Sequence, residues 1–143
     1  MKMKLRIFLD TNVFIYAFEF PKSNSRKIIE LLNEGKIEAV ISERVIKEVQ
    51  AYFKRYYGKD LASLFRNYLI LSCTIVPTIH VKDEMKKYRR KIKEKDLEQL
   101  AVVKKFGIKF LVSFDKDFKK FKEYKTPKIF IEDIGLIPNE EEF

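Results

Sequence analysis

The stretch Leu5-Arg6-Ile7-Phe8-Leu9-Asp10-Thr11-Asn12 indicates the fold class of this chain. All but one of the residues before Asp10 in this stretch are apolar, which is typical of a strand covered on both faces, as in a parallel sheet. Thr11 or Asn12 can then cap a helix over residues 13–20. Ligands of open α/β sheets bind beyond the carboxyl ends of the strands, so Asp10 stands where a site would be built. An isolated Asp at this point more often only caps the next helix, and a functional role therefore requires other carboxylates to converge on it.

Strand and helix patterns alternate along the rest of the chain. Strands are predicted at residues 37–41, 73–76, 110–112 and 128–131. Helices are predicted over residues 24–34, 43–53, 61–69, 82–95 and 96–106, and a polar tail over 135–143. Ser23 or Asn24 can cap the first of these helices, and Ser42 opens the second. Strands that alternate with helices imply a parallel sheet with right-handed crossovers. We therefore predict an α/β fold, with a central parallel β-sheet flanked by helices on both faces.

Length and composition favour one domain with an apolar core. The chain has 143 residues with 46% hydrophobic content, which is enough for one core and too little for two. No repeat, low-complexity tract or linker divides it, so residues 1–143 are treated as a single domain. The formal net charge of +9 favours polyanionic partners, such as nucleic acid or acidic protein surfaces.

The sequence shows no pattern for export or membrane insertion. No apolar run approaches the roughly 18 residues of a membrane helix, and the N-terminus enters strand-like sequence directly. The single cysteine, Cys73, rules out an internal disulfide, and we expect it to be a small buried hydrophobe. A cytoplasmic protein without membrane association is expected.

Carboxylates recur where the predicted strands end. Asp10 and Asp115 each follow an apolar run, and the carboxyl ends of parallel strands share one edge of a sheet. Glu48 lies on the helix after the second strand, and Asp96 begins the helix before residues 110–112. Clustered carboxylates repel one another, so a fold keeps several together only when a cation or a basic group compensates. An all-oxygen set suits Mg²⁺ or Mn²⁺ rather than zinc, and it supports phosphoryl displacement by a metal-activated water.

Each of these residues also has a structural explanation. Glu48, on a charged helix, would by itself be an ordinary solvated residue, and Asp96 can simply cap its helix. Asp117 can be a turn residue, because Asp is common in turns. His80, the only histidine, is better explained as an ordinary surface or packed residue than as a catalytic base. The chemical interpretation therefore depends on the whole set of acids and their order.

Taken in order, residues 9–12, 42–48, 95–96 and 113–118 resemble the acidic signature of PIN-domain ribonucleases. The order and approximate spacing match over almost the whole chain. By this resemblance the metal-binding, catalytic acids are Asp10, Glu48, Asp96 and Asp115, with Asp117 as a further ligand, and the polar residues that support them are Thr11, Asn12 and Ser113. The resemblance implies a PIN-like fold and Mg²⁺- or Mn²⁺-dependent endonucleolytic cleavage of single-stranded RNA.

The resemblance also implies partners. Many bacterial and archaeal members of the family are toxins, VapC-like proteins among them, that are held by a small antitoxin and are commonly dimeric. An antitoxin and a homodimer are therefore expected. Residues 89–95 lack the small, Gly- or Pro-containing lead-in often seen before the third acid of the toxins, which weakens the toxin assignment more than the nuclease assignment.

A basic run precedes the third acid. It includes Lys86, Lys87, Arg89 and Arg90, with Tyr88 interleaved. Such a run is most often a solvated helix face, but the positive net charge makes it a candidate RNA-binding segment. A second aromatic group, at residues 52–57, is expected to belong to the core or to a dimer interface.

Alternative functions stay open at this stage. A haloacid-dehalogenase-like phosphatase also places an Asp after its first strand, but it needs a second Asp two positions later, where this chain has Asn12. A housekeeping RNA-processing nuclease and a catalytically silent PIN-like RNA or protein adaptor remain as alternatives to the toxin. Binding of a divalent metal would separate the enzyme from the adaptor.

Overall fold

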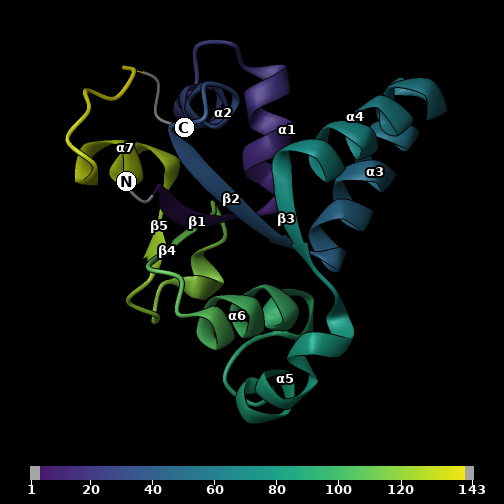
Figure 1. The fold of residues 1–143 in the computed structure, drawn as a ribbon, viewed down its shortest axis with the longest axis vertical. Coiled ribbons are helices and arrows are strands. Elements are labelled where there is room, and N and C mark those ends of the chain that lie inside the picture. Colours follow the sequence, from purple (N-terminus) through teal and green to yellow (C-terminus); the bar gives the residue numbers. More distant parts are fainter. Residues whose placement is uncertain (1–3, 141–143) are drawn as a thin grey trace.

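The centre of the molecule is a five-stranded parallel sheet (Figure 1). It is seen in a computed structural model that describes residues 4–140. The strands are β1 (Leu5–Leu9), β2 (Ile37–Ser42), β3 (Cys73–Val76), β4 (Phe110–Val112) and β5 (Tyr124–Lys125). Their spatial order is β3-β2-β1-β4-β5, which places β1 in the middle of the sheet. The predicted α/β class and the parallel sheet are confirmed.

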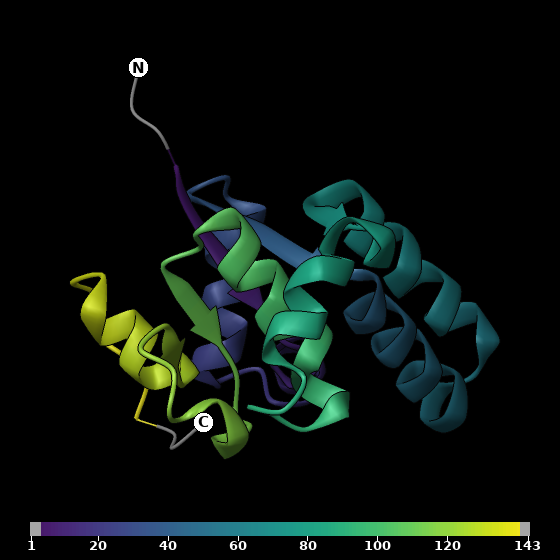
Figure 2. The ribbon, with the colours of Figure 1, turned by 90° about the horizontal axis from the view of Figure 1, so that it is seen from below.

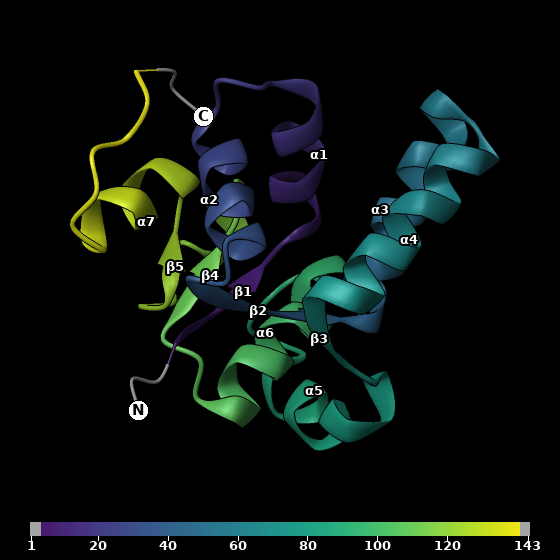
Figure 3. The same ribbon diagram turned by 45° about the horizontal axis from the view of Figure 1, so that its top comes forward.

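Helices cover both faces of this sheet. They are α1 (Thr11–Glu19), α2 (Asn24–Asn33), α3 (Glu43–Tyr57), α4 (Lys59–Ser72), α5 (Lys82–Tyr88), α6 (Glu94–Phe106) and α7 (Pro127–Asp133), with short 3-10 helices η1 (Thr78–Val81) and η2 (Lys116–Phe118). Figure 2 shows α6 and α5 in front of the sheet, with α1 and α2 behind it. Helix α7 lies beside β5, and α3 and α4 form a hairpin at the β3 side (Figure 3). None of the helices in residues 4–140 has the length and apolar character that crossing a membrane requires.

Helix α6 is buried for much of its length. All residues from Asp96 to Val103 are buried, polar ones included, because the helix is packed between the sheet and its neighbours α3 and α5. Its last turn is exposed and ends at Gly107, which has a φ of 60° in the left-handed region that favours glycine. The amino end of α6 lies near the carboxyl edge of the sheet.

Two predicted elements were wrong. Residues 128–131 lie in helix α7 rather than in a strand, because Thr126 caps the helix and Pro127 occupies its first turn. The last strand is β5, which is two residues long. The predicted helix over residues 82–95 ends at Tyr88, and turns lead from there to α6.

The helix caps were predicted in part. Ser23 and Ser42 cap α2 and α3 through their side chains, as their positions indicated. The cap of α1 is Asp10 itself rather than Thr11 or Asn12. The predicted single domain covers residues 1–143, and the predicted tail covers residues 135–143. Within these ranges, residues 1–3 and 141–143 lie outside the described residues.

Candidate active site

Two neighbouring strands end side by side at the carboxyl edge of the sheet. Leu9 of β1 pairs with Val112 of β4, and the backbone N–H of Asp10 donates to the carbonyl of Val112 at 3.0 Å. The strand order reverses here, because β2 and β3 lie on one side of β1 while β4 and β5 lie on the other. Such a reversal is where open α/β sheets bind ligands.

Asp10 is held in place from three directions. The residue is only 5% exposed, and its side chain accepts the backbone N–H of Thr11 at 2.9 Å, which caps α1. The hydroxyl of Ser113 donates to its other oxygen at 2.7 Å and accepts the backbone N–H of Asp115 at 2.9 Å. Hydrogen bonding from Gln99 adds a contact from α6. Ser113 therefore links Asp10 to the loop that carries Asp115.

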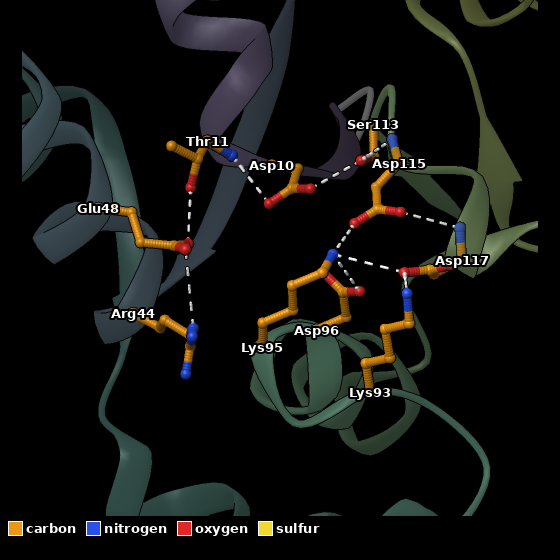
Figure 4. Close-up of polar contacts among 10 residues, drawn as sticks. All are labelled: Asp10, Thr11, Arg44, Glu48, Lys93, Lys95, Asp96, Ser113, Asp115 and Asp117. Carbon is orange, nitrogen blue, oxygen red and sulfur yellow. Dashed lines mark hydrogen bonds and ion pairs between the residues drawn. The ribbon is translucent and has the colours of Figure 1, made fainter.

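Three further carboxylates meet beside Asp10 (Figure 4). Asp96 comes from the first turn of α6, whereas Asp115 and Asp117 come from the segment after β4. One carboxylate oxygen of each lies within 4.8 Å of those of the other two. Asp115 also accepts the backbone N–H of Asp117 at 2.9 Å, which fixes the loop that presents both side chains. These are distances at which several oxygens can share one cation.

Glu48 approaches the site from α3. It accepts the hydroxyl of Thr11 at 2.9 Å, and the Nε of Arg44 lies 3.7 Å from its other oxygen. In Figure 4, Asp10 lies between Glu48 and Asp115. Glu48 is therefore joined to the cluster through Thr11 rather than by direct contact with the other acids.

Lysines balance part of this negative charge. The ammonium of Lys95 lies 2.9 Å from Asp96 and 3.5 Å from Asp117, and it also donates to Asp115. The ammonium of Lys93 lies 3.4 Å from Asp117. Both lysines stand at the amino end of α6, one of them as its N-cap.

Burial makes several of these carboxyls harder to ionise. Burial raises the pKa of Asp10, against the lowering effect of its bonds to Ser113, Thr11 and Gln99. Burial also raises the pKa of Glu48, and it raises that of Asp96 to about 6. A nearby cation offsets the free-energy cost of ionising such buried carboxyls.

The pKa values of Asp115 and Lys95 shift in opposite directions, because the two groups are paired. Partial burial would raise the pKa of Asp115, but hydrogen bonds from Lys95 and from the backbone of Asp117 lower it. Partial burial would likewise lower the pKa of Lys95, and its bonds to Asp115 and Asp96 raise it instead. The charged forms of this pair stabilise each other.

The remaining predicted residues lie further from the acids. Asn12 is exposed in the first turn of α1, and its side chain makes no hydrogen bond within the described part of the chain. The candidate RNA-binding segment covers the end of α5 and the turn after it. Its exposed side chains are Lys86, Lys87, Arg89 and Arg90. The Nε of Arg89 lies 3.5 Å from Glu94, so this segment reaches the amino end of α6.

Sequence reasoning missed some residues of the site. Gln99 is one helical turn after Asp96, and this i, i+3 spacing could have placed both on one face of α6. Lys95 directly precedes Asp96, yet nothing in its sequence context indicated that its side chain turns back onto the acids. Arg44 was hidden in the same way within a charged helix.

The residues present fit a hard divalent cation. The available ligands are carboxylate oxygens, which Mg²⁺ and Mn²⁺ prefer, and three of them are already close together. Asp96 and Asp10 are both buried, and the ammonium of Lys95 occupies the space between three of the acids. Asp96, Asp115 and Asp117 are the residues best placed to hold the ion, with Asp10 next to them.

Comparisons with known proteins agree with this fold. The family model of the PIN domain matches residues 7–124. No curated protein matches the sequence. A toxin-antitoxin complex from Klebsiella pneumoniae contains a chain that is similar in structure, with a TM-score of 0.68 and 19% identity, over 85% of this chain and 97% of that one.

Two other solved structures are similar to this chain. One is VapC20 of Mycobacterium tuberculosis, a sarcin-ricin loop cleaving toxin, with a TM-score of 0.60 and 20% identity over 80% of this chain and 93% of that one. The other is VapBC2 from Rickettsia felis bound to a DNA fragment from their promoter, with a TM-score of 0.62 and 18% identity over 85% and 98%. At these identities the likeness is one of fold.

Proposed function

The chain belongs to the PIN-domain family, and from this premise we propose that it is an endoribonuclease that cleaves single-stranded RNA with Mg²⁺ or Mn²⁺. The observation that carries the proposal is the convergence of Asp10, Asp96, Asp115 and Asp117 at the reversal of strand order. A partly buried acidic cluster is costly to keep in a fold, and a metal-dependent reaction explains its presence.

The side chains of the proposed site have different roles. Asp96, Asp115 and Asp117 would hold the ion, and Asp10 lies next to them at the end of β1. Ser113 and Thr11 orient the carboxylates of Asp10 and Glu48 through hydrogen bonds of 2.7 and 2.9 Å. When bound, Mg²⁺ or Mn²⁺ supplies an activated water and stabilises charge on the phosphate.

Positive charge around the site supports a nucleic-acid substrate. The chain carries a net charge of +9, although its candidate active site is acidic. The exposed residues of α5 and the following turn reach the start of α6 through the ion pair of Arg89 with Glu94. We assign Lys86, Lys87, Arg89 and Arg90 to binding of RNA phosphates outside the acidic centre.

The fold also supports a partner protein. Among the solved structures that resemble this chain, one is a toxin-antitoxin complex and one is a toxin that cleaves the sarcin-ricin loop, so we propose that this chain acts as a toxin held by a small antitoxin. The resemblance to the toxins of the family extends this proposal to a homodimer. A housekeeping RNA-processing nuclease is the second candidate. It is favoured by the charged residues 89–95, which lack the Gly- or Pro-containing lead-in often seen in the toxins.

A cleavage assay tests the nuclease proposal. The purified protein should cut a labelled single-stranded RNA with Mn²⁺ or Mg²⁺, stop when EDTA is added, and resume when metal is restored. Asp10→Asn should cut at a rate lower by orders of magnitude, while exposed Glu132→Gln should cut like the wild type. Cleavage that persists in EDTA, or an Asp10→Asn protein with wild-type rate, would rule out the proposed site.

A further inference from the structure

One side chain occupies the middle of the acidic cluster. The ammonium of Lys95 contacts Asp96, Asp115 and Asp117, which are the same three carboxylates whose oxygens lie within 4.8 Å of one another (Figure 4). No other basic side chain in the described residues reaches more than one of these acids. Lys95 therefore stands where the proposed ion would bind.

We propose that Lys95 is an internal counter-cation, which holds the metal position in the metal-free protein and leaves it when Mg²⁺ or Mn²⁺ binds. This inference rests on the proposed function. Mg²⁺ binds oxygens at about 2.1 Å in near-octahedral geometry, so it needs the carboxylate lone pairs that Lys95 now uses. An ammonium among the same oxygens would also repel the incoming cation.

The structure allows Lys95 to move while the acids stay. Its side chain is 49% exposed and lies on the first turn of α6, with a flexible aliphatic stem. Asp96 is 5% exposed and is fixed within the packed helix. Asp115 is held by Ser113 and by the backbone of Asp117. An exchange of cations therefore needs no change in the backbone.

The exchange has two consequences of opposite sign. Without the ammonium, the metal-free protein keeps three carboxylates that repel one another, so its stability should fall. Without the competitor, the divalent ion should bind more tightly. If Lys95 were only a surface residue, its removal would change neither the stability of the metal-free protein nor the affinity for the divalent ion. If Lys95 helped to hold the ion, its removal would weaken ion binding.

Lys95→Met tests this directly, because methionine keeps much of the length of the stem and removes the charge. The matched control is Lys116→Met, at an exposed lysine that neighbours Asp115 in sequence and whose ammonium contacts none of the acids in the described structure. Mn²⁺ binding is measured by calorimetry without RNA, and thermal unfolding is measured in EDTA. We expect Lys95→Met to bind Mn²⁺ roughly tenfold more tightly and to unfold at a lower temperature in EDTA, with little change in the control.

A second measurement uses the wild-type protein and does not depend on the folding of a variant. Reductive methylation followed by mass spectrometry reports the reactivity of each lysine, and saturating Mg²⁺ should accelerate the labelling of Lys95 relative to Lys116. Equal or weaker Mn²⁺ binding by Lys95→Met, or labelling of Lys95 that Mg²⁺ leaves unchanged, would overturn the inference. Absence of Mn²⁺ binding in both wild type and variant would instead overturn the proposed function, and this inference with it.

Discussion

Asp10 combines two tasks that sequence reasoning treated as alternatives. Its Oδ1 accepts the backbone N–H of Thr11 and caps α1, while its Oδ2 accepts the hydroxyl of Ser113 and so belongs to the acidic centre. A carboxylate has enough lone pairs to do both. The cap also sets the orientation of the side chain, so the structural task serves the chemical one.

Asp10→Asn should separate the two tasks. Asparagine caps helices as well as aspartate does, and it keeps an oxygen for Thr11. Because burial raises the pKa of Asp10, the folded wild type holds a proton that the unfolded chain releases at lower pH. The stabilisation from this proton is present below the unfolded pKa and is lost as the pH rises through the folded pKa. In EDTA at pH 8 we expect Asp10→Asn to be more stable than the wild type by thermal unfolding, with a smaller difference near pH 4.

The control for this comparison is Glu132→Gln, at an exposed carboxylate of α7. It should change the stability little at either pH, since an exposed charge gains and loses little on folding. An Asp10→Asn protein that unfolds at a lower temperature than the wild type at pH 8 in EDTA would show that the buried charge does not oppose folding.

Asp115 and Asp117 can be ranked from their contacts. Asp115 is 21% exposed and is tied to Asp10 through Ser113, whereas Asp117 is 33% exposed and pairs with two lysines at 3.4 and 3.5 Å. We expect Asp115→Asn to lose most of its RNA cleavage at saturating Mn²⁺. Asp117→Asn should keep more activity and respond to higher metal concentration. Rates of the two variants measured side by side across a Mn²⁺ titration decide this, and the reverse order would make Asp117 the principal ligand.

Whole elements show where sequence patterns are sufficient and where they fail. The central strand β1 and the caps Ser23 and Ser42 were predictable, because buried runs and capping hydroxyls are local signals. Helix α7 was mistaken for a strand, since Ile129, Phe130 and Ile131 form a short apolar run with β-branched members. Helical spacing instead places Pro127, Phe130 and Ile131 on the buried face of α7 and leaves Ile129 41% exposed.

The candidate site was predictable to a similar degree. The acids follow strand ends or begin helices, and parallel strands bring such positions to one edge, so Asp10, Asp96 and Asp115 could be grouped from the sequence alone. Lys95 and Gln99 could not, because their role depends on where a side chain turns after α6 has packed. The buried part of α6 also lacks an exposed face, since the helix is covered on several sides.

Glu98 gives α6 a structural role beside its chemical one. It is 7% exposed and accepts the backbone N–H of Arg44 at 3.1 Å and the hydroxyl of Thr78 at 3.0 Å, which joins α6 to α3 and η1. Glu98→Ala should lower the free energy of unfolding by about 1–3 kcal/mol, because it leaves these donors without their acceptor. Urea titration measures the loss. Exposed Glu94→Ala is the matched control, expected within about 0.5 kcal/mol of the wild type, and equal losses in the two variants would contradict the role of Glu98.

At the scale of the whole molecule, charge is distributed unevenly about the sheet. The carboxyl edge holds the acids, which repel phosphate, while the net charge of the chain is +9. A polyanion can approach the acidic centre only if basic side chains beside it outweigh that repulsion. The exposed residues of α5 and the turn after it are the basic group that joins the amino end of α6.

Salt dependence of RNA binding tests this distribution. Neutralised phosphates release counterions, and each contact with single-stranded nucleic acid contributes about 0.7 to the slope of log K against log salt concentration. The test variant replaces with Ala the residues Lys86, Lys87, Arg89 and Arg90. We expect its slope to be shallower by at most roughly three, measured by fluorescence anisotropy with labelled RNA in EDTA, where cleavage is blocked.

The matched control removes the same charge from the opposite edge of the sheet. Three of the control lysines directly precede a strand, so they lie at the amino edge of the sheet: Lys4 before β1, Lys36 before β2 and Lys109 before β4. The fourth, Lys105, lies in the last turn of α6, at the opposite end of that helix from Asp96. Their replacement with Ala lowers the net charge equally but should leave most of the slope in place. Equal flattening in both quadruple variants would mean that RNA responds only to net charge. An unchanged slope in the α5 variant would place this segment outside the RNA path, as an ordinary solvated helix face.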